Sequence, residues 1–321
     1  MKQPTTNNQQ PTTFKFLRYL SNNTILGNIV PRRIKFLMYI YFQKRTGMKT
    51  NKLLHFEVLL TDHCNLNCAG CSVFSPISAE KYLDPLCYEK DCKRISELTN
   101  GKMVTIRLLG GEPLLHPDIN SIFTITRTYF PELNKTEETG IIDLITNGIL
   151  LHKQPDDFWE ACKINNIRVV ISEYPIELKT ETIKEKAKQF NVELKMNSEK
   201  NHFHETGSAN HWVKIPIDIN GLQKNKRSFG KCPLAGNCFQ LVKGKIFKCA
   251  RIAYIDDFNA TFNTRLKIGE SDYVDIYEAK DIKEILYLLT KPASFCRYCK
   301  VDNTTWDNKW KVSKKLLDEW I

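Results

Sequence analysis

Three cysteines, Cys64, Cys68 and Cys71, stand within eight positions in the stretch TDHCNLNCAGCSVFSP, residues 61–76. Three thiolates on one loop can bind three corners of a four-iron four-sulfur cube and leave the fourth iron without a protein ligand. A structural zinc ion needs a fourth ligand, and His63, directly beside Cys64, is poorly placed to wrap a tetrahedral ion. With 11 cysteines in 321 residues, chance alone predicts about 0.01 CxxxCxxC matches. The spacing therefore favours an iron–sulfur site with one open iron.

A second group of cysteines lies in the last hundred residues. It comprises Cys232, Cys238, Cys249, Cys296 and Cys299. The chain shows no export signal, and thiols that stay reduced in the cytoplasm bind metal or do catalysis more often than they form disulfides. We therefore expect a cytoplasmic protein with a second metal-binding region. The remaining Cys87, Cys92 and Cys162 lie in helix-like stretches and are expected to be buried packing residues.

Alternating strands and helices must position these thiols. Apolar strand-like runs cover residues 54–60, 103–109, 141–146, 167–172 and 192–196, and helical patterns cover residues 79–99, 117–130, 156–164 and 178–190. Repeated strand–helix units predict an α/β fold with a parallel sheet, whose functional residues gather beyond the carboxyl ends of the strands. The polar motifs follow that rule. They are the cysteine loop after the first strand, GGEP (110–113) after the second, TNG (146–148) after the third, and Ser172 with Glu173 at the end of the fourth.

CxxxCxxC after the first strand with GGEP after the second resembles the signature of the radical S-adenosylmethionine superfamily. The resemblance implies a partial (β/α)6 TIM-type barrel, open on one side. It also implies that Cys64, Cys68 and Cys71 hold a 4Fe-4S cluster whose open iron chelates S-adenosylmethionine. Gly110, Gly111 and Glu112 would meet the amino group of that cofactor, and Asn147, Ser172 and Glu173 would contact its ribose or its carboxylate. Gly70 departs from the pattern, because many members carry an aromatic residue just before the third cysteine.

The C-terminal cysteines resemble the start of the SPASM and twitch auxiliary-cluster domains. In both, a cysteine precedes a glycine-containing hairpin and a further cysteine, as Cys232, Gly244 and Cys249 do here, and FCRYC (295–299) supplies a CxxC pair. The resemblance implies one auxiliary 4Fe-4S cluster on Cys249, Cys296 and Cys299, with Cys232 or Cys238 as the fourth ligand. A zinc site built from the same thiols is the alternative.

The expected domain order is a disordered leader (1–13), a basic amphipathic arm (14–50), the radical SAM core (51–220) and a small cysteine-rich extension (221–321). Residues 14–46 interleave apolar and basic residues, which predicts contact with a protein surface or with a membrane surface. Their longest apolar run, residues 36–42, is far too short to span a bilayer. The net charge of +11 is spread along the chain, so we expect a solvated basic surface and no specific nucleic-acid partner.

The resemblance implies an enzyme that cleaves S-adenosylmethionine to a 5′-deoxyadenosyl radical and takes hydrogen from a carbon of a sugar or other small molecule, as an oxidoreductase or related enzyme. Net oxidation or epimerisation would follow, and the latter needs a hydrogen donor such as Cys87, Cys92 or Cys162. A peptide-modifying enzyme and a catalytically silent scaffold are the alternatives. An electron donor such as flavodoxin or ferredoxin is the expected partner.

Other polar and aromatic residues receive plainer interpretations. The HPD turn with His116 and Asp118 is typical of a helix cap, and loop histidines are most often solvated. Tryptophans at near-helical spacing in the tail predict core packing. These loop histidines and tryptophans are His202, His204, His211, Trp306, Trp310 and Trp320.

Overall fold

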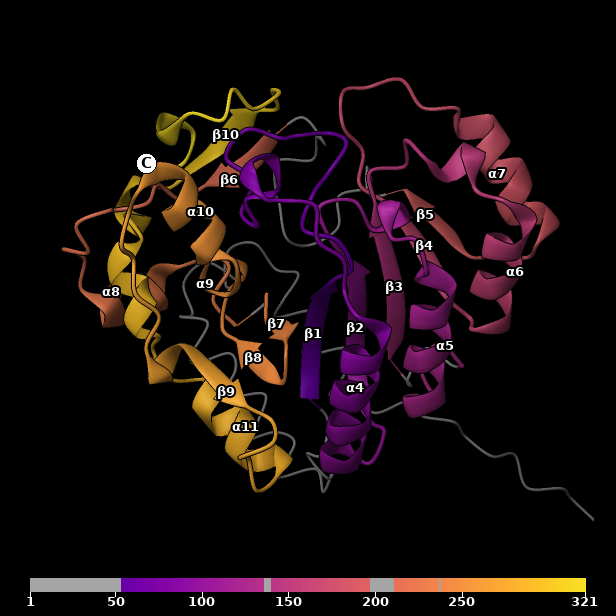
Figure 1. Ribbon diagram of the computed structural model, residues 1–321, viewed down its shortest axis with the longest axis horizontal. Helices are drawn as coiled ribbons and strands as arrows, with labels where there is room; N and C mark the ends of the chain where they lie inside the picture. Colours follow the sequence, from indigo (N-terminus) through magenta and orange to yellow (C-terminus); the bar gives the residue numbers. More distant parts are fainter. Residues whose placement is uncertain (1–52, 136–139, 197–210, 237) are drawn as a thin grey trace, which may run out of the picture. The chain divides into compact units, whose positions relative to one another are not determined.

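The computed structural model describes residues 53–135, 140–196, 211–236 and 238–321. Five strands alternate with four helices in its first half (Figure 1). They are β1 (Leu53–Leu59), α4 (Pro85–Thr99), β2 (Met103–Leu109), α5 (Ile119–Tyr129), β3 (Ile141–Thr146), α6 (Asp156–Ile164), β4 (Arg168–Ile171), α7 (Thr180–Gln189) and β5 (Leu194–Met196). The predicted leader and basic arm, residues 1–50, lie outside the described residues.

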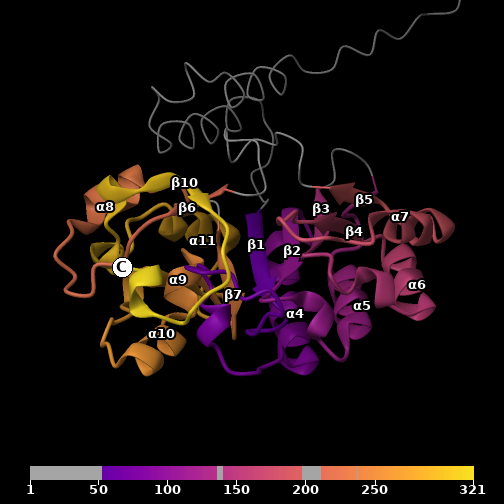
Figure 2. The same cartoon turned by 90° about the horizontal axis from the view of Figure 1, so that it is seen from above.

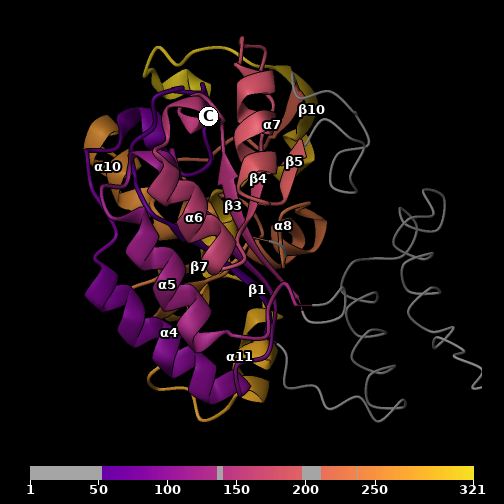
Figure 3. The same cartoon turned by 90° about the vertical axis from the view of Figure 1, so that its right-hand side faces the viewer.

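A single eight-stranded sheet, in the order β5-β4-β3-β2-β1-β7-β8-β9, forms the centre of this part of the chain. Strands β1 to β5 are parallel to their neighbours. Helices α4, α5 and α6 cover one face of them (Figures 2 and 3). Because parallel strands point the same way, the segments that follow β1, β2, β3 and β4 all emerge at the carboxyl ends of the strands, along the same edge of the sheet.

Apolar side chains from strands and helices form the main core. Phe56 and Ile106 from the sheet and Phe123 and Trp159 from α5 and α6 are all buried in it. Helix α4 begins where the side chain of Asp84 accepts a hydrogen bond from the Leu86 amide. Strong apolar periodicity and this N-cap explain why the pattern of the sequence predicted these elements well.

The C-terminal extension continues the same sheet beyond strand β1. Strand β7 (Gln240–Val242) pairs parallel to β1, and β8 (Lys245–Phe247) and β9 (Tyr273–Asp275) follow in antiparallel order. Helices α8 (Asn225–Lys231), α9 (Ala250–Ala253), α10 (Ile255–Phe262) and α11 (Ile282–Leu289) complete the extension. A second apolar core there gathers around Trp320, which packs against Phe74, Phe258 and Phe262.

The expected open α/β barrel is confirmed, because the sheet is mainly parallel, is covered by helices and is not closed. Beyond β5 the chain departs from a simple series of strand–helix units. Strand β6 (His211–Lys214) pairs with β10 (Thr305–Lys309) in a separate two-stranded antiparallel sheet. Among the described residues, no helix is both long and apolar enough to cross a membrane.

Asp91 on α4 connects the helix layer to the extension. Its carboxylate accepts hydrogen bonds of 2.8 Å from the Gly244 amide in the β7–β8 turn and from the Tyr277 hydroxyl. We predict that Asp91→Ala lowers the free energy of unfolding by about 1.5–3 kcal/mol, the range for a hydrogen bond to a charged group. Urea unfolding followed by tryptophan fluorescence measures the change. Glu97→Ala, on the exposed face of the same helix, should change it by no more than about 0.5 kcal/mol.

Candidate functional site

The loop after β1 brings three thiols together. Cys64, Cys68 and Cys71 lie close enough to influence one another's ionisation, and the loop turns through residues with positive φ at Asn67 (50°) and Gly70 (69°). A side chain at Gly70 would be strained in that conformation, which explains why no aromatic residue precedes the third cysteine. Burial raises the pKa of the Cys64 thiol to about 11 and that of Cys68 to about 12.

The GGEP motif packs directly beneath this loop. The Gly111 amide donates a hydrogen bond of 2.7 Å to the Thr61 carbonyl, and the Glu112 amide donates one of 3.1 Å to the His63 carbonyl. A Cβ atom on Gly111 would lie 2.0 Å from the carbonyl oxygen of His63, and one on Gly110 would lie 2.8 Å from that of Thr61. Only glycine permits such close approach, so both glycines are needed to dock the two motifs.

Glu112 has no exposed surface, and its carboxylate is turned into the protein. It accepts hydrogen bonds from the Thr146 hydroxyl (2.5 Å), the Leu114 amide (3.1 Å) and the Asn147 amide (2.9 Å). Burial raises the pKa of this carboxyl to about 7, although the three donors oppose the shift. The side chain therefore organises the ends of β2 and β3. Gly110 and Gly111 are half-buried, and no hydrogen bond to their carbonyls is found among the described residues.

Asn147 connects the end of β3 to the cysteine loop. Its side-chain amide donates to the side-chain oxygen Oδ1 of Asn65 at 2.8 Å and lies 3.8 Å from the Cys64 sulfur. Ser172 sits at the end of β4, where its amide donates to the Thr146 carbonyl, and the neighbouring Glu173 is half-buried. The structure thus gathers the predicted residues of β2, β3 and β4 at one edge of the sheet.

Two aromatic residues that we did not assign to the site lie against Cys68. The indole N–H of Trp310 donates to the Cys68 sulfur at 3.1 Å, and Tyr174 lies close enough to the same sulfur to affect the pKa of the Cys68 thiol. Backbone hydrogen bonds from Ala69 to Lys311 and from Ser313 to Asn67 hold the tail over the cysteine loop. The expectation of core packing was wrong for Trp310, because the tail forms an extended segment here rather than a helix. It was correct for Trp320, which is buried.

The charges of the C-terminal cysteines act on one another, and Cys238 interacts with fewer of them than the other four do. Cys249, Cys296 and Cys299 each have Cys232 among the charges that act on them. Burial raises the pKa of the Cys238 thiol, and among the charges that act on it Glu57 of β1 comes before Cys249 and Cys232. Burial raises the pKa of the Cys249 thiol to about 12. This arrangement favours Cys232 over Cys238 as the fourth member of the set.

Other candidate residues have structural roles. Both ring nitrogens of His116 are engaged, one by the Leu83 carbonyl and one by the Asp118 amide, which makes HPD a capping turn. Cys92 and Cys162 are buried in the main core, and burial raises the pKa of each thiol, so neither is placed to deliver hydrogen to a substrate. The expectation of burial was wrong for Cys87, which is exposed and donates to the Asp84 carboxylate. His202 and His204, and the side chain of His211, lie outside the described residues.

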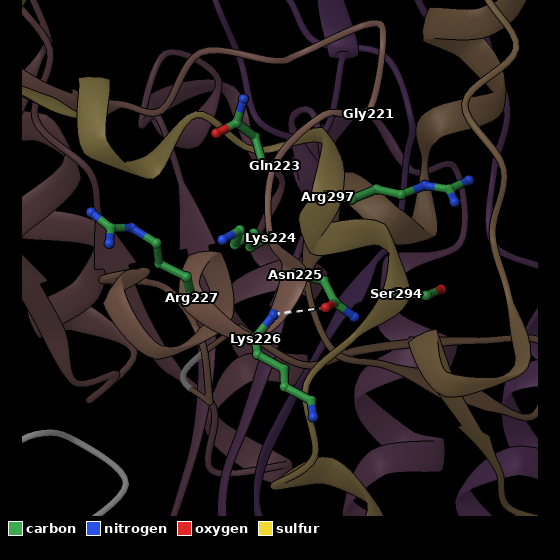
Figure 4. Close-up of a pocket in the computed structure, with 8 residues that line it drawn as sticks. All are labelled: Gly221, Gln223, Lys224, Asn225, Lys226, Arg227, Ser294 and Arg297. Carbon is green, nitrogen blue, oxygen red and sulfur yellow. Dashed lines mark hydrogen bonds between the residues drawn. The ribbon is translucent and has the colours of Figure 1, made fainter.

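A pocket of about 550 Å³ lies on the extension, away from the cysteine loop (Figure 4). Lys224, Lys226, Arg227 and Arg297 contribute to its lining. Figure 4 shows the charged ends of Lys226, Arg227 and Arg297 pointing in different directions, so they do not converge on one anion.

The two cysteine sets were each predicted to hold a metal centre. Among the described residues, no three His, Cys, Asp or Glu side chains converge closely enough to hold a single ion. A zinc ion holds each sulfur ligand at about 2.3 Å from one point, whereas an iron–sulfur cluster takes each thiolate on a different iron. A cluster can therefore be held by thiols that do not converge on one point, as those of the described residues do not.

The raised pKa of Glu112 predicts a pH dependence of stability. A carboxyl whose folded pKa lies above its unfolded value of 4.5 contributes stability that is present below pH 4.5 and is lost as pH rises through about 7. The full loss is about 3 kcal/mol, of which roughly 1 kcal/mol falls between pH 6 and pH 8.5. Urea unfolding of the iron-free protein should show that loss in the wild type and not in Glu112→Gln. Parallel pH profiles of the two proteins would contradict it.

Comparisons with known proteins agree with the motif. No family model matches the chain. It is 31% identical over 107 residues to the GTP 3′,8-cyclase of Chlorobaculum tepidum, which is 33% of this chain and 29% of the relative. It is 30% identical over 99 residues to the GTP 3′,8-cyclase of Petrotoga mobilis, 31% of this chain and 28% of the relative. The chain thus spans less than a third of the length of these curated relatives.

Two solved structures resemble the chain at low identity. BtrN in complex with AdoMet and 2-DOIA is 15% identical, with 84% of this chain and 97% of that chain covered and a TM-score of 0.44. Native anSMEcpe with bound AdoMet is 13% identical, with 77% and 83% covered and a TM-score of 0.45. The intact cysteine motif, the GGEP motif packed beneath it and the partial sequence similarity to the cyclases agree with the resemblance to the radical S-adenosylmethionine superfamily.

Proposed function

We propose that the chain is a radical S-adenosylmethionine enzyme whose Cys64, Cys68 and Cys71 hold a 4Fe-4S cluster. The observation that carries this proposal is the meeting of the three thiols with Gly111 and Asn147 at one edge of the sheet. When bound, the cluster and the cofactor supply a 5′-deoxyadenosyl radical that takes hydrogen from an unactivated carbon. The protein binds and orients both reactants and excludes water.

The thiols must lose protons to act as ligands. Burial holds the pKa of Cys64 near 11 and that of Cys68 near 12, so both are neutral in the metal-free chain at neutral pH. Cluster assembly therefore releases a proton from each of these thiols, and it should become easier as pH rises. Trp310 and Tyr174 donate to the Cys68 sulfur and so stabilise its anionic form.

Main-chain carbonyls of Gly110 and Gly111 are the acceptors that we assign to the amino group of the cofactor. Glu112 contributes indirectly, because its buried carboxylate holds the Asn147 amide at 2.9 Å. We assign Asn147, Ser172 and Glu173 to the ribose and carboxylate of the cofactor, since they follow β3 and β4 at the same edge of the sheet.

We further propose a sugar or another small molecule as substrate, with a low-potential electron donor such as flavodoxin or ferredoxin. The partial sequence similarity is to cyclases named for the small molecule GTP, which supports this class over a peptide. On the extension, Cys232, Cys249, Cys296 and Cys299 are the ligands that we propose for an auxiliary metal centre. A peptide-modifying enzyme and a silent scaffold remain the competing hypotheses.

Anaerobic reconstitution with iron and sulfide tests the central proposal. With dithionite as reductant, the protein should convert S-adenosylmethionine into 5′-deoxyadenosine and methionine, measured by liquid chromatography. Replacing Cys64, Cys68 and Cys71 by alanine should abolish the reaction and remove about four irons per chain. Cys87→Ala, which changes an exposed thiol outside both sets, should leave both unchanged. A cluster-replete protein that forms no 5′-deoxyadenosine would favour the scaffold hypothesis.

The Trp310 contact predicts an effect on the reduction potential. An N–H donor withdraws electron density from a thiolate ligand and favours the reduced cluster. Trp310→Phe should therefore shift the potential to more negative values by about 59 mV, which is a tenfold change in the reduction equilibrium for one electron. A redox titration followed by electron paramagnetic resonance measures this shift. Tyr174→Phe should act in the same direction, and Tyr287→Phe on α11 should have no effect.

A further inference from the structure

Arg251 is a buried cation next to the C-terminal cysteines. It lies in α9, two residues after Cys249, and exposes 5% of its surface. Its Nε and Nη1 groups are buried without a hydrogen-bond partner in the part of the chain that the structure describes. Figure 1 shows α9 beside the β7–β8 hairpin, on the same side of the molecule as the other elements of the extension.

An unpaired guanidinium in this position is costly. Arginine stays charged at any ordinary pH, and a buried charge without a partner destabilises a fold by several kcal/mol. No ion pair joins Arg251 to an acidic side chain among the described residues. Lys214, another cation, also lies near Arg251. Burial lowers the pKa of Lys214, and the positive charges of Lys311 and Arg251 lower it further.

Two of the thiols lie close to Arg251. Burial raises the pKa of the Cys249 and Cys299 thiols, and the nearby positive charge of Arg251 opposes that shift in both. A second buried cation, Lys248, is 3% exposed and lies near Cys296. The positive charge of Lys248 is stabilised by other groups. Its ammonium donates to the Lys291 carbonyl at 3.1 Å, and Asp272 is the first of the charges that favour its protonated form.

We propose that Arg251 is the buried counter-ion of an anionic metal–thiolate centre held by Cys232, Cys249, Cys296 and Cys299. Four thiolates around a core with two positive charges leave two negative charges, whether the core is an oxidised 4Fe-4S cluster or a zinc ion. Arg251 neutralises one of them inside the protein. Its unpaired N–H groups then have anionic sulfur as acceptor, which removes the cost of burying them.

This inference rests on the auxiliary centre of the proposed function and adds a residue outside its ligand set. Arg251 acts as a positioning residue, because it would contact the thiolate ligands rather than the metal. Its loss should weaken retention of the metal and, for a cluster, make the reduction potential more negative.

Two matched variants separate charge from shape. Arg251→Lys keeps the charge and Arg251→Met removes it. Arg297→Met removes an equally charged side chain that lies between Cys296 and Cys299 but is exposed and packs on the Tyr298 ring. All three are made in a chain in which Cys64, Cys68 and Cys71 are alanine, so that any remaining metal belongs to the C-terminal set.

Iron and zinc per chain, the rate of metal release to excess EDTA and the reduction potential are measured after anaerobic reconstitution. Arg251→Met should release metal about 10–100-fold faster, the range for losing a partner of a metal ligand, whereas Arg251→Lys should restore most of the retention. Arg297→Met should match the parent. If Arg251→Met does not fold, Arg251→Gln replaces it.

Release rates and potentials that are the same in Arg251→Met and Arg297→Met would overturn the inference. Equal losses in Arg251→Met and Arg251→Lys would overturn it as well, since packing rather than charge would then be responsible. Metal-free parent protein would also overturn it, while cleavage of S-adenosylmethionine by the wild type would still support the proposed function. Zinc in place of iron would keep Arg251 as the counter-ion and change only the metal.

Discussion

The close approach of two backbone segments, Gly110–Gly111 and Thr61–His63, is the constraint on which the site depends. A single Cβ atom at Gly111 would overlap the His63 carbonyl, so the end of β2 can lie beneath the cysteine loop only as long as it carries glycine. That contact fixes the distance between the cysteine loop and the end of β2. Glu112 follows Gly111, and its carboxylate accepts a hydrogen bond from the Asn147 amide at the end of β3. The side chain of Asn147 in turn lies beside the Cys64 sulfur.

A small apolar cluster joins the core to the extension. Leu59 at the end of β1, Val73 after the cysteine motif and Ala250 after Cys249 pack together, and Cys71 lies against them. The two cysteine sets are therefore neighbours across a few apolar side chains, although the sequence separates Cys71 from Cys249 by more than half of the chain. A displacement of the side chains in one cysteine set can be transmitted to the other set through this contact, because closely packed protein interiors have low compressibility.

Periodic elements could be predicted well from the sequence, and tertiary contacts could not. The expected strands 103–109 and 141–146 and the helix 156–164 agree with β2, β3 and α6, because each has a strong apolar pattern with clear ends. The motif loops could be placed at the strand ends for the same reason. Trp310 and Arg251 carry no local signal, since what makes them notable is a sulfur atom brought close by the fold. The burial of Glu112 was missed because a charged residue in a motif is normally expected to face a ligand.

The tail segment that lies over the cysteine loop has a consequence for biosynthesis. Trp310 follows Cys68 by 242 residues, and a ribosome adds about 5–20 residues each second. The loop that carries the first three thiols thus leaves the ribosome on the order of ten seconds or more before the segment that covers it. During that interval the three thiols lack the contacts that Trp310, Lys311 and Ser313 later make with their loop. The part of the chain that covers the cysteine loop is therefore among the last to be synthesised, and the environment of Cys68 is completed only then.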